Sequence, residues 1–465
     1  MNVPEQIFRE YDIRGIVDKD LTEELAHAVG RAYGSSLRAA ILAGEGEGDS
    51  EGGLPRVAVG HDNRPSSPRL VDALIEGLTS TGVDVLDLGV VPTPVTWWAE
   101  PTIGTQGAIQ LTGSHNPPEW NGIKMTRLGR SLYGAGVQEL KGRIVRDDFL
   151  SGTGARRSSP VLDRYVEDLV GRFDLPRPVR VVVDCGNGTG SVVAVRLLEA
   201  AGAEVIPLYC ESDGTFPNHH PDPTVDEFLV DLIAMVREHE ADLGVAFDGD
   251  ADRLGAVDEK GRIIRGDILL LLFGLDLLRR RGPDQLLIFD VKCSQVLPEV
   301  YEKAGGRSLM WKTGHSLIKE KMKETGAPLA GELSGHICFA DDYLGIDDAL
   351  YDALRLIDLV ARSETPLSAQ VDAFPKYFST PEIRIEVTEE TKVRVVAAAV
   401  EHFSRTHEVL DVDGARILFG DGWALLRSSN TQPVIVARFE ARSPERLAEI
   451  RGEVQGWLRE QGVNV

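Results

Sequence analysis

The stretch VRVVVDCGNGTG, residues 179–190, is a short β-branched run that ends at an aspartate and a glycine-rich turn. Two more stretches have the same form, RVAVGHDNR at 56–64 and LLIFDVKCS at 286–294. Apolar runs of this length suit buried parallel strands. Each is followed by a helix-like segment, a second strand and a third strand that runs into a polar loop. The second strands are 82–89, 202–209 and 306–314, and the third strands with their loops are 107–117, 241–253 and 327–336. This repeated order predicts three α/β units of similar topology.

The C-terminal part of the chain has a different pattern. An alternating run at 380–390 precedes a helix-like segment, three strand-like runs within 414–441 and a last amphipathic helix. This order predicts an α+β domain with an antiparallel sheet. Ligands of open α/β sheets gather at the carboxyl ends of strands, so we expect the three polar loops to converge on one cleft. The predicted domains are 1–155, 156–260, 261–375 and 376–465.

The composition limits the partners of the chain. Its 465 residues carry a formal net charge of −23, which repels nucleic acid and anionic membranes, so we expect neither as a partner. An anionic substrate would need a locally basic site. The four cysteines form no C-x-x-C pair and favour free thiols in a reducing compartment. The N-terminus lacks the apolar run of a signal peptide, and the run at 268–278 is too short to span a bilayer and predicts a buried helix. We therefore expect a cytoplasmic protein.

The loop DGDADR, residues 248–253, is the candidate metal site. Asp248, Asp250 and Asp252 alternate along it, which points three carboxylates the same way in an extended loop and favours a hard cation. An EF-hand is excluded because Arg253 stands where its glycine is needed and the flanks are strand-like. The pattern indicates Mg²⁺ with a phosphate oxygen, with a solvated acidic turn as the alternative. Arg253 either neutralises the carboxylates or binds a substrate phosphate.

The stretch LTGSHNPPEWNGIKM, residues 111–125, places Ser114 and His115 in one turn. A hydrolase nucleophile would stand in G-x-S-x-G, whereas residue 116 is Asn. Because neighbouring side chains normally diverge, we do not expect His115 to act as the base for Ser114. A hydroxyl in a glycine turn, combined with a metal loop elsewhere, suits phosphoryl transfer. Lys124 either balances a phosphate or is solvated.

Two later loops carry polar groups. Glu332, Ser334 and His336 of GELSGH (331–336) have single-residue gaps, so they point one way on an extended loop and suit the hydroxyls of a polyol; an ordinary turn with a capping serine is the alternative. The loop RSSNTQP (427–433) offers one positive charge and several hydroxyl and amide donors. It is either a phosphate cradle without a Walker lysine or a polar hairpin loop.

Together with YDIRG (11–15) and KTGH (312–315), these loops resemble those of the α-D-phosphohexomutase family, in the family's order and over nearly the whole chain. The resemblance implies four domains around a central cleft: three share an α/β topology, and the fourth is a smaller α+β domain resembling TATA-binding protein. It implies interconversion of hexose 1-phosphate and hexose 6-phosphate through a phosphoserine and a hexose 1,6-bisphosphate, with Mg²⁺ as cofactor.

The resemblance also implies roles for individual residues. Ser114 would be the phosphoserine, and Asp248, Asp250 and Asp252 would hold Mg²⁺ with one of its oxygens. Arg14, His115, Lys124 and Arg253 would surround the moving phosphoryl group, with Lys124 and His336 as proton-transfer groups. The implied substrate contacts are Lys292, His315, Glu332, Ser334 and His336 for the sugar, and Arg427, Ser429, Asn430, Thr431, Tyr11 and Arg438 for the phosphate that does not react.

Leu333 and Ser334 bear on the sugar. Phosphoglucosamine mutases usually show Gln-Ser at these positions, and ordinary phosphoglucomutases a Ser-Phe-Gly type loop, so the chain resembles the phosphomannomutase/phosphoglucomutase type, acting on mannose, glucose or both. The alternatives are a phosphoglucosamine mutase, a metal-dependent phosphatase and a non-catalytic sugar-phosphate binder. Ala251 stands where glycine is common in the family, with no effect expected, and the segment 44–53 has no family role. We expect a monomer or dimer with small sugar phosphates as ligands.

Overall fold

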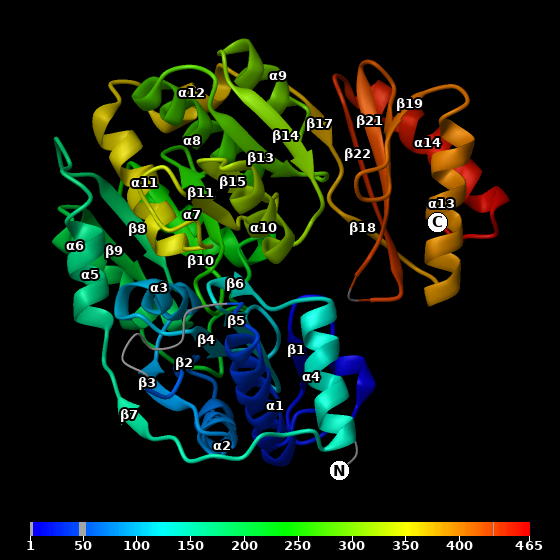
Figure 1. Ribbon diagram of the computed structural model, residues 1–465. Helices are drawn as coiled ribbons and strands as arrows, with labels where there is room; N and C mark the ends of the chain where they lie inside the picture. Colours follow the sequence, from blue (N-terminus) through cyan, green and yellow to red (C-terminus); the bar gives the residue numbers. More distant parts are fainter. Residues whose placement is uncertain (1–2, 46–52, 431) are drawn as a thin grey trace. The chain divides into compact units, whose positions relative to one another are not determined.

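The structure is a computed structural model that describes residues 3–45, 53–430 and 432–465 (Figure 1). Most of the glycine and acid segment at 44–53, residues 46–52, lies outside the described residues. The chain divides into two compact units. The first comprises residues up to Leu269 together with Ser334–Ala369, and the second comprises Leu270–Leu333 together with Gln370–Val465. The helices α8 (Gly266–Arg281) and α12 (Leu367–Asp372) carry the chain from one unit to the other.

The first sheet is mixed and has the order β1-β5-β4-β2-β3-β7, with β6 paired to β5. Strand β2 is parallel to β3 and β4, whereas β5 is antiparallel to β4 and β1. The elements of this region are η1 (Glu5–Ile7), β1 (Ile13–Ile16), α1 (Glu23–Leu42), β2 (Arg56–His61), α2 (Ser67–Thr79), β3 (Asp84–Val90), α3 (Thr93–Ile103), β4 (Gly107–Leu111), β5 (Trp120–Arg127), β6 (Arg130–Ser131), α4 (Ala135–Arg146), β7 (Arg156–Ser158) and α5 (Leu162–Val170).

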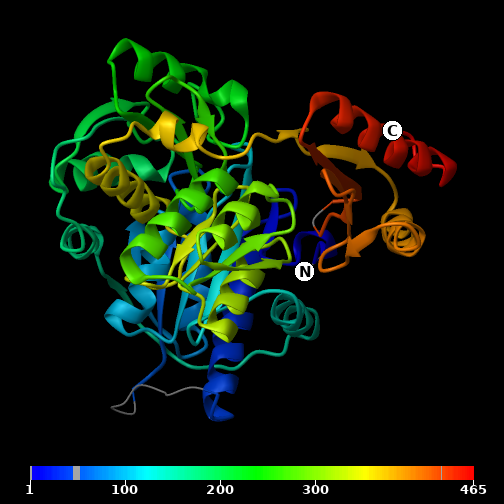
Figure 2. The same ribbon diagram turned by 90° about the horizontal axis from the view of Figure 1, so that it is seen from above.

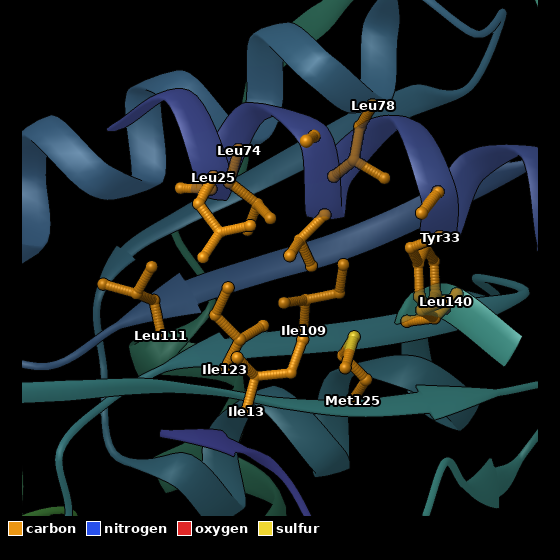
Figure 3. Packing of buried hydrophobic residues seen from close by; sticks show 14 of the residues in the cluster. Ile13, Leu25, Tyr33, Leu74, Leu78, Ile109, Leu111, Ile123, Met125 and Leu140 are labelled. Atoms are coloured by element: carbon orange, nitrogen blue, oxygen red, sulfur yellow. The ribbon is translucent and has the colours of Figure 1, made fainter. Parts of the chain in front are cut away.

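Helices α1 and α2 bury one apolar face each against this sheet. Thr22 caps α1 by accepting a hydrogen bond from the backbone N–H of Leu25 (3.2 Å). Figure 3 shows Leu25 of α1 and Leu74 of α2 facing the strand residues Ile109 and Ile123. Burying each such side chain contributes about 1.5–3 kcal/mol, so this core fixes the strands whose loops carry the polar residues.

The second sheet has the order β12-β11-β10-β8-β9. Strands β9, β8 and β10 are parallel, and β11 returns antiparallel to β10. Its elements are β8 (Arg180–Asp184), η2 (Thr189–Val192), α6 (Ala194–Ala200), β9 (Glu204–Leu208), η3 (Asp226–Leu229), α7 (Val230–Glu238), β10 (Leu243–Phe247), β11 (Leu254–Asp258) and β12 (Ile263–Ile264). The first unit also contains β16 (Ile337–Phe339) and α11 (Ala349–Arg362).

The second unit begins with three parallel strands in the order β14-β13-β15. This order matches β3-β2-β4 and β9-β8-β10, so the prediction of three α/β repeats of similar topology is confirmed. The elements are β13 (Leu286–Asp290), α9 (Val296–Lys303), β14 (Arg307–Trp311), α10 (His315–Thr325) and β15 (Leu329–Gly331). The run at 268–278 lies within α8, as the sequence predicts.

The C-terminal sheet is antiparallel, in the order β17-β22-β21-β20-β19 with β18 paired to β22. Figure 2 shows α13 (orange) and α14 (red) beside this sheet, and both share its apolar core. The elements are β17 (Phe378–Ser379), β18 (Ile383–Glu386), α13 (Glu389–Phe403), β19 (Glu408–Leu410), β20 (Ala415–Leu418), β21 (Gly422–Ser428), β22 (Val434–Ala441) and α14 (Pro444–Glu460). The predicted α+β domain is confirmed; β19 is an additional short strand.

Among the described residues, no helix combines the length and the apolar character needed to cross a bilayer.

Candidate active site

Three carboxylates meet in the loop between β10 and β11. Asp248, Asp250 and Asp252 are fully buried, and each offers an oxygen within 4.8 Å of the others. Within the described residues, Oδ1 of Asp250 is buried without a hydrogen-bond partner. An unsatisfied buried carboxylate oxygen is costly unless a cation binds it. The donor set of three carboxylates therefore fits Mg²⁺, which prefers oxygen ligands.

Lys124 on β5 neutralises part of this negative charge. Its Nζ lies 2.7 Å from Asp250 Oδ2 and 2.5 Å from Asp252 Oδ2. Burial lowers the pKa of Lys124, but these two carboxylates outweigh burial and raise it. Burial and the neighbouring carboxylates Asp252 and Asp250 raise the pKa of Asp248 well above its usual range. One lysine does not balance three carboxylates, so the site favours a second positive charge.

Ser114 lies directly against this triad. Its Oγ donates a hydrogen bond to Asp248 Oδ2 at 2.9 Å, and the side chain is buried. Ser114 has a φ of +49°, in the left-handed region that non-glycine residues rarely occupy. The turn that carries the hydroxyl is therefore held in a strained conformation.

The expectation that His115 diverges from Ser114 is wrong. His115 Nδ1 lies 3.0 Å from Ser114 Oγ, because the left-handed backbone of Ser114 turns the two side chains together. Burial and the charges of Arg253 and Arg14 hold the pKa of His115 well below its usual range, so the ring is neutral at pH 7. Ser114 Oγ thus lies within hydrogen-bond distance of both Asp248 Oδ2 and His115 Nδ1, and the tautomer of His115 sets which of Ser114 and His115 donates.

Gly249 allows the metal loop to approach the serine turn. A Cβ at this position would overlap the carbonyl oxygen of Ser114. Ala251, two residues on, has a φ of +57°, which explains why glycine suits this position. Thr93, at the start of α3, donates its hydroxyl to Asp250 Oδ2 (2.5 Å) and its backbone N–H to the Asp250 carbonyl (3.0 Å). The loop is thus fixed from two sides.

Asp62 and Arg64 brace the serine turn from the end of β2, and sequence reasoning missed both. The buried Arg64 guanidinium donates to the carbonyls of Ser114 (2.7 Å), Asn116 (2.6 Å) and Pro117 (2.5 Å). Asp62 accepts from Arg64 Nε at 2.9 Å. It also accepts from the Thr112 hydroxyl and the Gly113 N–H, both at 3.0 Å.

Among the other predicted residues of the first unit, Arg253 contacts the triad and Arg14 contacts the serine turn. Arg14 is held by Asp12 (2.5 Å) and donates to Asn116 Oδ1 (2.6 Å). Tyr11 is half-buried in the same segment. Arg253 donates its backbone N–H to Asp248 Oδ1 at 3.2 Å.

His336 contacts the triad on another side. Its Nε2 lies 3.1 Å from Asp252 Oδ1 and 3.3 Å from Arg253 Nε, and Ser334 Oγ lies 3.4 Å from its Nδ1. The missed residue Asp347 forms a second buried cluster with His336 and Asp252, with ligand atoms within 4.8 Å.

The second unit carries the remaining predicted residues. Lys292, after β13, is buried and donates to Glu382 Oε1 at 2.7 Å. Glu332 Oε1 accepts the Gly314 N–H at 2.6 Å, so Glu332 lies against the KTGH loop. His315 is the first residue of α10 and is half-buried.

The RSSNTQP loop adjoins the KTGH loop through Asp413. Asp413 Oδ2 accepts from Arg427 Nε at 2.5 Å and from the Thr313 N–H at 3.0 Å. Ser429 is buried and Asn430 is exposed, whereas Thr431 lies outside the described residues. Arg438 is buried and donates to the Lys292 carbonyl (2.5 Å). The second unit therefore brings Lys292, Glu332, Arg427 and Arg438 into one network.

Of the missed residues, Asp62 has a signal that the sequence contains. An aspartate stands at the carboxyl end of the first strand of each repeat: Asp62 directly follows β2, and Asp184 and Asp290 are the last residues of β8 and β13. Asp290 accepts from the Leu333 N–H (3.2 Å) and the Thr313 hydroxyl (2.9 Å), just as Asp62 accepts from Thr112 and Gly113. The recurrence of aspartate at this place was a local sign of a loop-bracing role.

Comparison with known proteins identifies the family. Four domain models of the phosphoglucomutase/phosphomannomutase family match the chain: alpha/beta/alpha domain I at residues 5–149, domain II at 163–261, domain III at 265–378 and the C-terminal domain at 382–456.

Similar proteins extend over almost the full chain. A phosphomannomutase/phosphoglucomutase of Pseudomonas aeruginosa is 47% identical over 459 residues, covering 98% of this chain and 96% of the relative. A phosphoglucomutase of Neisseria gonorrhoeae is 41% identical over 455 residues, covering 97% and 96%. The crystal structure of a phosphoglucomutase/phosphomannomutase family protein from Burkholderia thailandensis has a TM-score of 0.91 and 43% identity, covering 100% and 99%. The chain therefore belongs to the phosphoglucomutase/phosphomannomutase family and is a phosphohexomutase, an enzyme that transfers a phosphoryl group within a hexose phosphate.

Proposed function

We propose that Ser114 carries the phosphoryl group of the resting enzyme and exchanges it with hexose 1-phosphate and hexose 6-phosphate. Transfer from Ser114 to the free hydroxyl forms hexose 1,6-bisphosphate, and return of the other phosphoryl group to Ser114 releases the isomeric monophosphate. The observation that carries this proposal is the hydrogen bond between Ser114 Oγ and Asp248 Oδ2, 2.9 Å long. It places a buried hydroxyl on a carboxylate triad suited to a metal, an arrangement typical of phosphoryl transfer.

Asp248, Asp250 and Asp252 would hold Mg²⁺ together with an oxygen of phosphorylated Ser114. Bound Mg²⁺ neutralises charge that develops on phosphoryl oxygens. Support comes from the unpartnered Oδ1 of Asp250 and from the excess of carboxylates over Lys124. Hexose 1,6-bisphosphate would serve as the activator that restores the phosphate on Ser114.

The cationic side chains would stabilise the charge of the moving phosphoryl group. Arg14, Arg253 and Lys124 supply fixed positive charge, and neutral His115 forms a hydrogen bond with Ser114 Oγ. Lys124 and His336 would be the proton-transfer groups. Because Asp250 and Asp252 raise the pKa of Lys124, Lys124 stays protonated, which favours its role as a positive charge over its role as an acid. His336 would accept the proton of the attacking sugar hydroxyl.

The polar residues of the later loops would hold the rest of the substrate. Glu332 and Ser334 would bind the 3- and 4-hydroxyls of the sugar, with Lys292 and His315 as further contacts. The phosphate that does not react would be bound by Arg427, Ser429, Asn430, Thr431, Arg438 and Tyr11. Arg427 is buried, and its hydrogen bond to Asp413 fixes its guanidinium group in place. A guanidinium that is already fixed loses little conformational entropy when it binds phosphate, which supports this role.

The sugar would be mannose, glucose or both, in keeping with the names of the relatives. A phosphoglucosamine mutase and a metal-dependent sugar-phosphate phosphatase are the alternatives. A coupled assay compares glucose 1-phosphate, mannose 1-phosphate and glucosamine 1-phosphate, each with its bisphosphate activator. We expect turnover of the first two; preference for glucosamine 1-phosphate favours the first alternative, and phosphate release equal to product formation favours the second.

Ser114→Ala tests the phosphoserine directly. We expect the variant to lose turnover and to lack the phosphate detected by intact mass on the parent chain. Ser80→Ala, at an exposed helix end, is the matched control and should behave as the parent. Full activity of Ser114→Ala would overturn the proposal.

We also propose that the enzyme works in the cytoplasm as a monomer or dimer, with small sugar phosphates as its ligands. All four cysteines are free, which is typical of a reducing compartment. Fractionation of cells and light scattering of the purified chain test these two statements.

A further inference from the structure

Cys185 and Cys210 lie side by side in the second sheet, and their Sγ atoms are 3.1 Å apart. Cys185 directly follows β8, Cys210 comes two residues after β9, and these strands are parallel neighbours. The paired register ends at Asp184 and Leu208, so both cysteines lie just beyond it, and the Sγ–Sγ distance is the observation that permits a bond. Bond formation would bring the two sulfur atoms only about 1 Å closer.

The two thiols differ in access and in acidity. Cys185 is fully buried, whereas Cys210 is half-buried. The contact with Cys185 lowers the pKa of the Cys210 thiol, and the same contact together with burial raises the pKa of Cys185. Because the thiolate is the reactive form, Cys210 is the thiol that a reagent meets first and Cys185 is placed to resolve the product.

We propose that Cys185 and Cys210 form an oxidation site for hydrogen peroxide. The Cys210 thiolate attacks one peroxide oxygen, the O–O bond breaks, and the departing hydroxide takes a proton and leaves as water, which gives a sulfenic acid. The Cys185 sulfur then attacks the Cys210 sulfur, the S–O bond breaks, and the hydroxyl group leaves as water with the Cys185 proton. The two sulfurs lose two electrons and the peroxide gains two; a dithiol reductant reverses the step by exchange.

The thiol pair is connected to the metal loop by a short path. The Gly188 N–H donates to the Cys185 carbonyl at 2.8 Å. Thr189 donates its N–H and its hydroxyl to the Gly249 carbonyl, at 3.0 and 3.1 Å. A Cβ on Gly188 would lie 2.7 Å from that same oxygen. The turn that contains Gly188 and the turn that contains Gly249 are therefore in close contact. Gly249 stands between Asp248 and Asp250.

We expect closure of the disulfide to shift this turn, which contacts the backbone of Gly249 between the proposed Mg²⁺ ligands Asp248 and Asp250. Because a 1 Å misplacement of a reacting group can cost about 100-fold in rate, we expect the disulfide to lower turnover and to raise the Mg²⁺ concentration required for half-maximal activity at least several-fold. This consequence rests on the proposed function of Asp248 and Asp250, whereas the covalent step does not.

The test uses the full chain, hydrogen peroxide in small excess, an alkylating reagent and a non-reducing digest. We expect a mass loss of about 2 Da and a peptide pair linked through Cys185 and Cys210. Mutase activity is then titrated with Mg²⁺ in the reduced, oxidised and dithiothreitol-treated enzyme. The expected result is a reversible rise in the half-saturating Mg²⁺ concentration.

Matched variants separate this site from the other thiols. Cys293→Ser with Cys338→Ser should still form the link, whereas Cys210→Ser and Cys185→Ser should not; circular dichroism verifies that each variant is folded. Alkylation of both Cys185 and Cys210 after peroxide treatment, or accumulation of a sulfinic acid on Cys210, would overturn the oxidation site. A complete link with an unchanged Mg²⁺ titration would overturn its coupling to the metal loop. The peptide map decides the first question even in an enzyme that proves inactive.

Discussion

The Nη2 atom of Arg64 lies 2.7 Å from the carbonyl oxygen of Ser114, at the centre of hydrogen bonds that brace the turn in which Ser114 has its left-handed conformation. Arg64 reaches three carbonyl oxygens of one turn and ties them to Asp62. Only a planar guanidinium presents donors in that arrangement. The position of the Ser114 hydroxyl therefore depends on Arg64, a buried residue outside the carboxylate cluster.

Arg64→Lys should lower kcat by about 10- to 100-fold, because one ammonium group cannot replace the three carbonyl contacts and the serine turn relaxes. Steady-state kinetics with glucose 1-phosphate measures the effect, and KM should change less than kcat. Arg69→Lys is the control, since the ion pairs of Arg69 with Asp18 and Glu23 lie at the exposed surface. Equal kcat values for the two variants would show that the brace does not position Ser114.

Lys124→Met should increase the dependence of stability on divalent metal. Without metal, the loss of Lys124 leaves Asp250 and Asp252 buried without their ion-pair partner, which costs about 3–5 kcal/mol. With metal, the cation takes over this charge and stabilises the folded state by mass action. The difference in Tm between MgCl₂ and EDTA should therefore be larger than in the parent.

Lys141→Met is the matched control for this experiment, because Lys141 pairs with the exposed Glu5. Its Tm difference should equal that of the parent. If Lys124→Met shows no increase in the difference, the cluster does not bind Mg²⁺ through these two carboxylates.

Asp348 should make the enzyme less stable as the pH rises from 4 to 6. Burial raises the pKa of Asp348 to about 6, while hydrogen bonds from Tyr343 and Tyr165 oppose the rise. A carboxyl whose pKa is higher in the folded state than in the unfolded state ionises less readily when the protein is folded. The free energy of unfolding therefore decreases as the pH rises from the unfolded-state pKa to the folded-state pKa. The difference from the ordinary value amounts to a loss on the order of 3 kcal/mol above pH 6.

Asp348→Asn removes this titration and keeps a side chain that can cap α11. Urea denaturation at each pH measures the free energy of unfolding of both proteins. Between pH 4 and pH 7, the difference between variant and parent should shift in favour of the variant by on the order of 3 kcal/mol. Asp342→Asn, an exposed neighbour, should give parallel curves. Parallel curves for Asp348→Asn as well would mean that Asp348 does not titrate in this range.

Lys392→Met should weaken substrate binding. Lys392 is buried on α13 and donates to the carbonyls of Ser429 (2.7 Å) and Gln432 (3.1 Å), which fixes the backbone of the loop that we propose binds phosphate. Removing it should raise KM roughly tenfold with a smaller change in kcat, as expected for a contact to the phosphate that does not react. Glu389→Gln removes only the exposed partner of Lys392 and should retain the parental KM.

Features encoded by short-range patterns could be predicted from the sequence. The strand, turn and helix order of the repeats follows from local hydrophobic runs, and the alternation of Asp248, Asp250 and Asp252 places three carboxylates together because all belong to one loop. The structure places Ser114 against this loop, although 134 positions separate Ser114 and Asp248. The repeat pattern predicted that these loops converge, but the specific pairing of Ser114 with Asp248 came only from the resemblance.

The rest depends on backbone conformation and distant contacts. No local sequence pattern indicates that Ser114 has a positive φ. Because this conformation could not be predicted, the position of the His115 side chain was predicted wrongly. Arg64 reaches a turn some fifty positions away. Asp413 reaches the KTGH loop at Thr313, a hundred positions away. Such partners appear only when strands from different parts of the chain are placed side by side.

The aspartates at the carboxyl ends of β2 and β13 bear on how mutases with a different sugar specificity can arise. The carboxylates of Asp62 and Asp290 accept hydrogen bonds from backbone N–H groups and threonine hydroxyls of neighbouring loops. These bonds do not involve the exposed side chains of those loops. The exposed side chains can therefore be exchanged while the loop keeps its place. Libraries confined to exposed loop positions, with these aspartates unchanged, are the economical way to select mutases for other sugars.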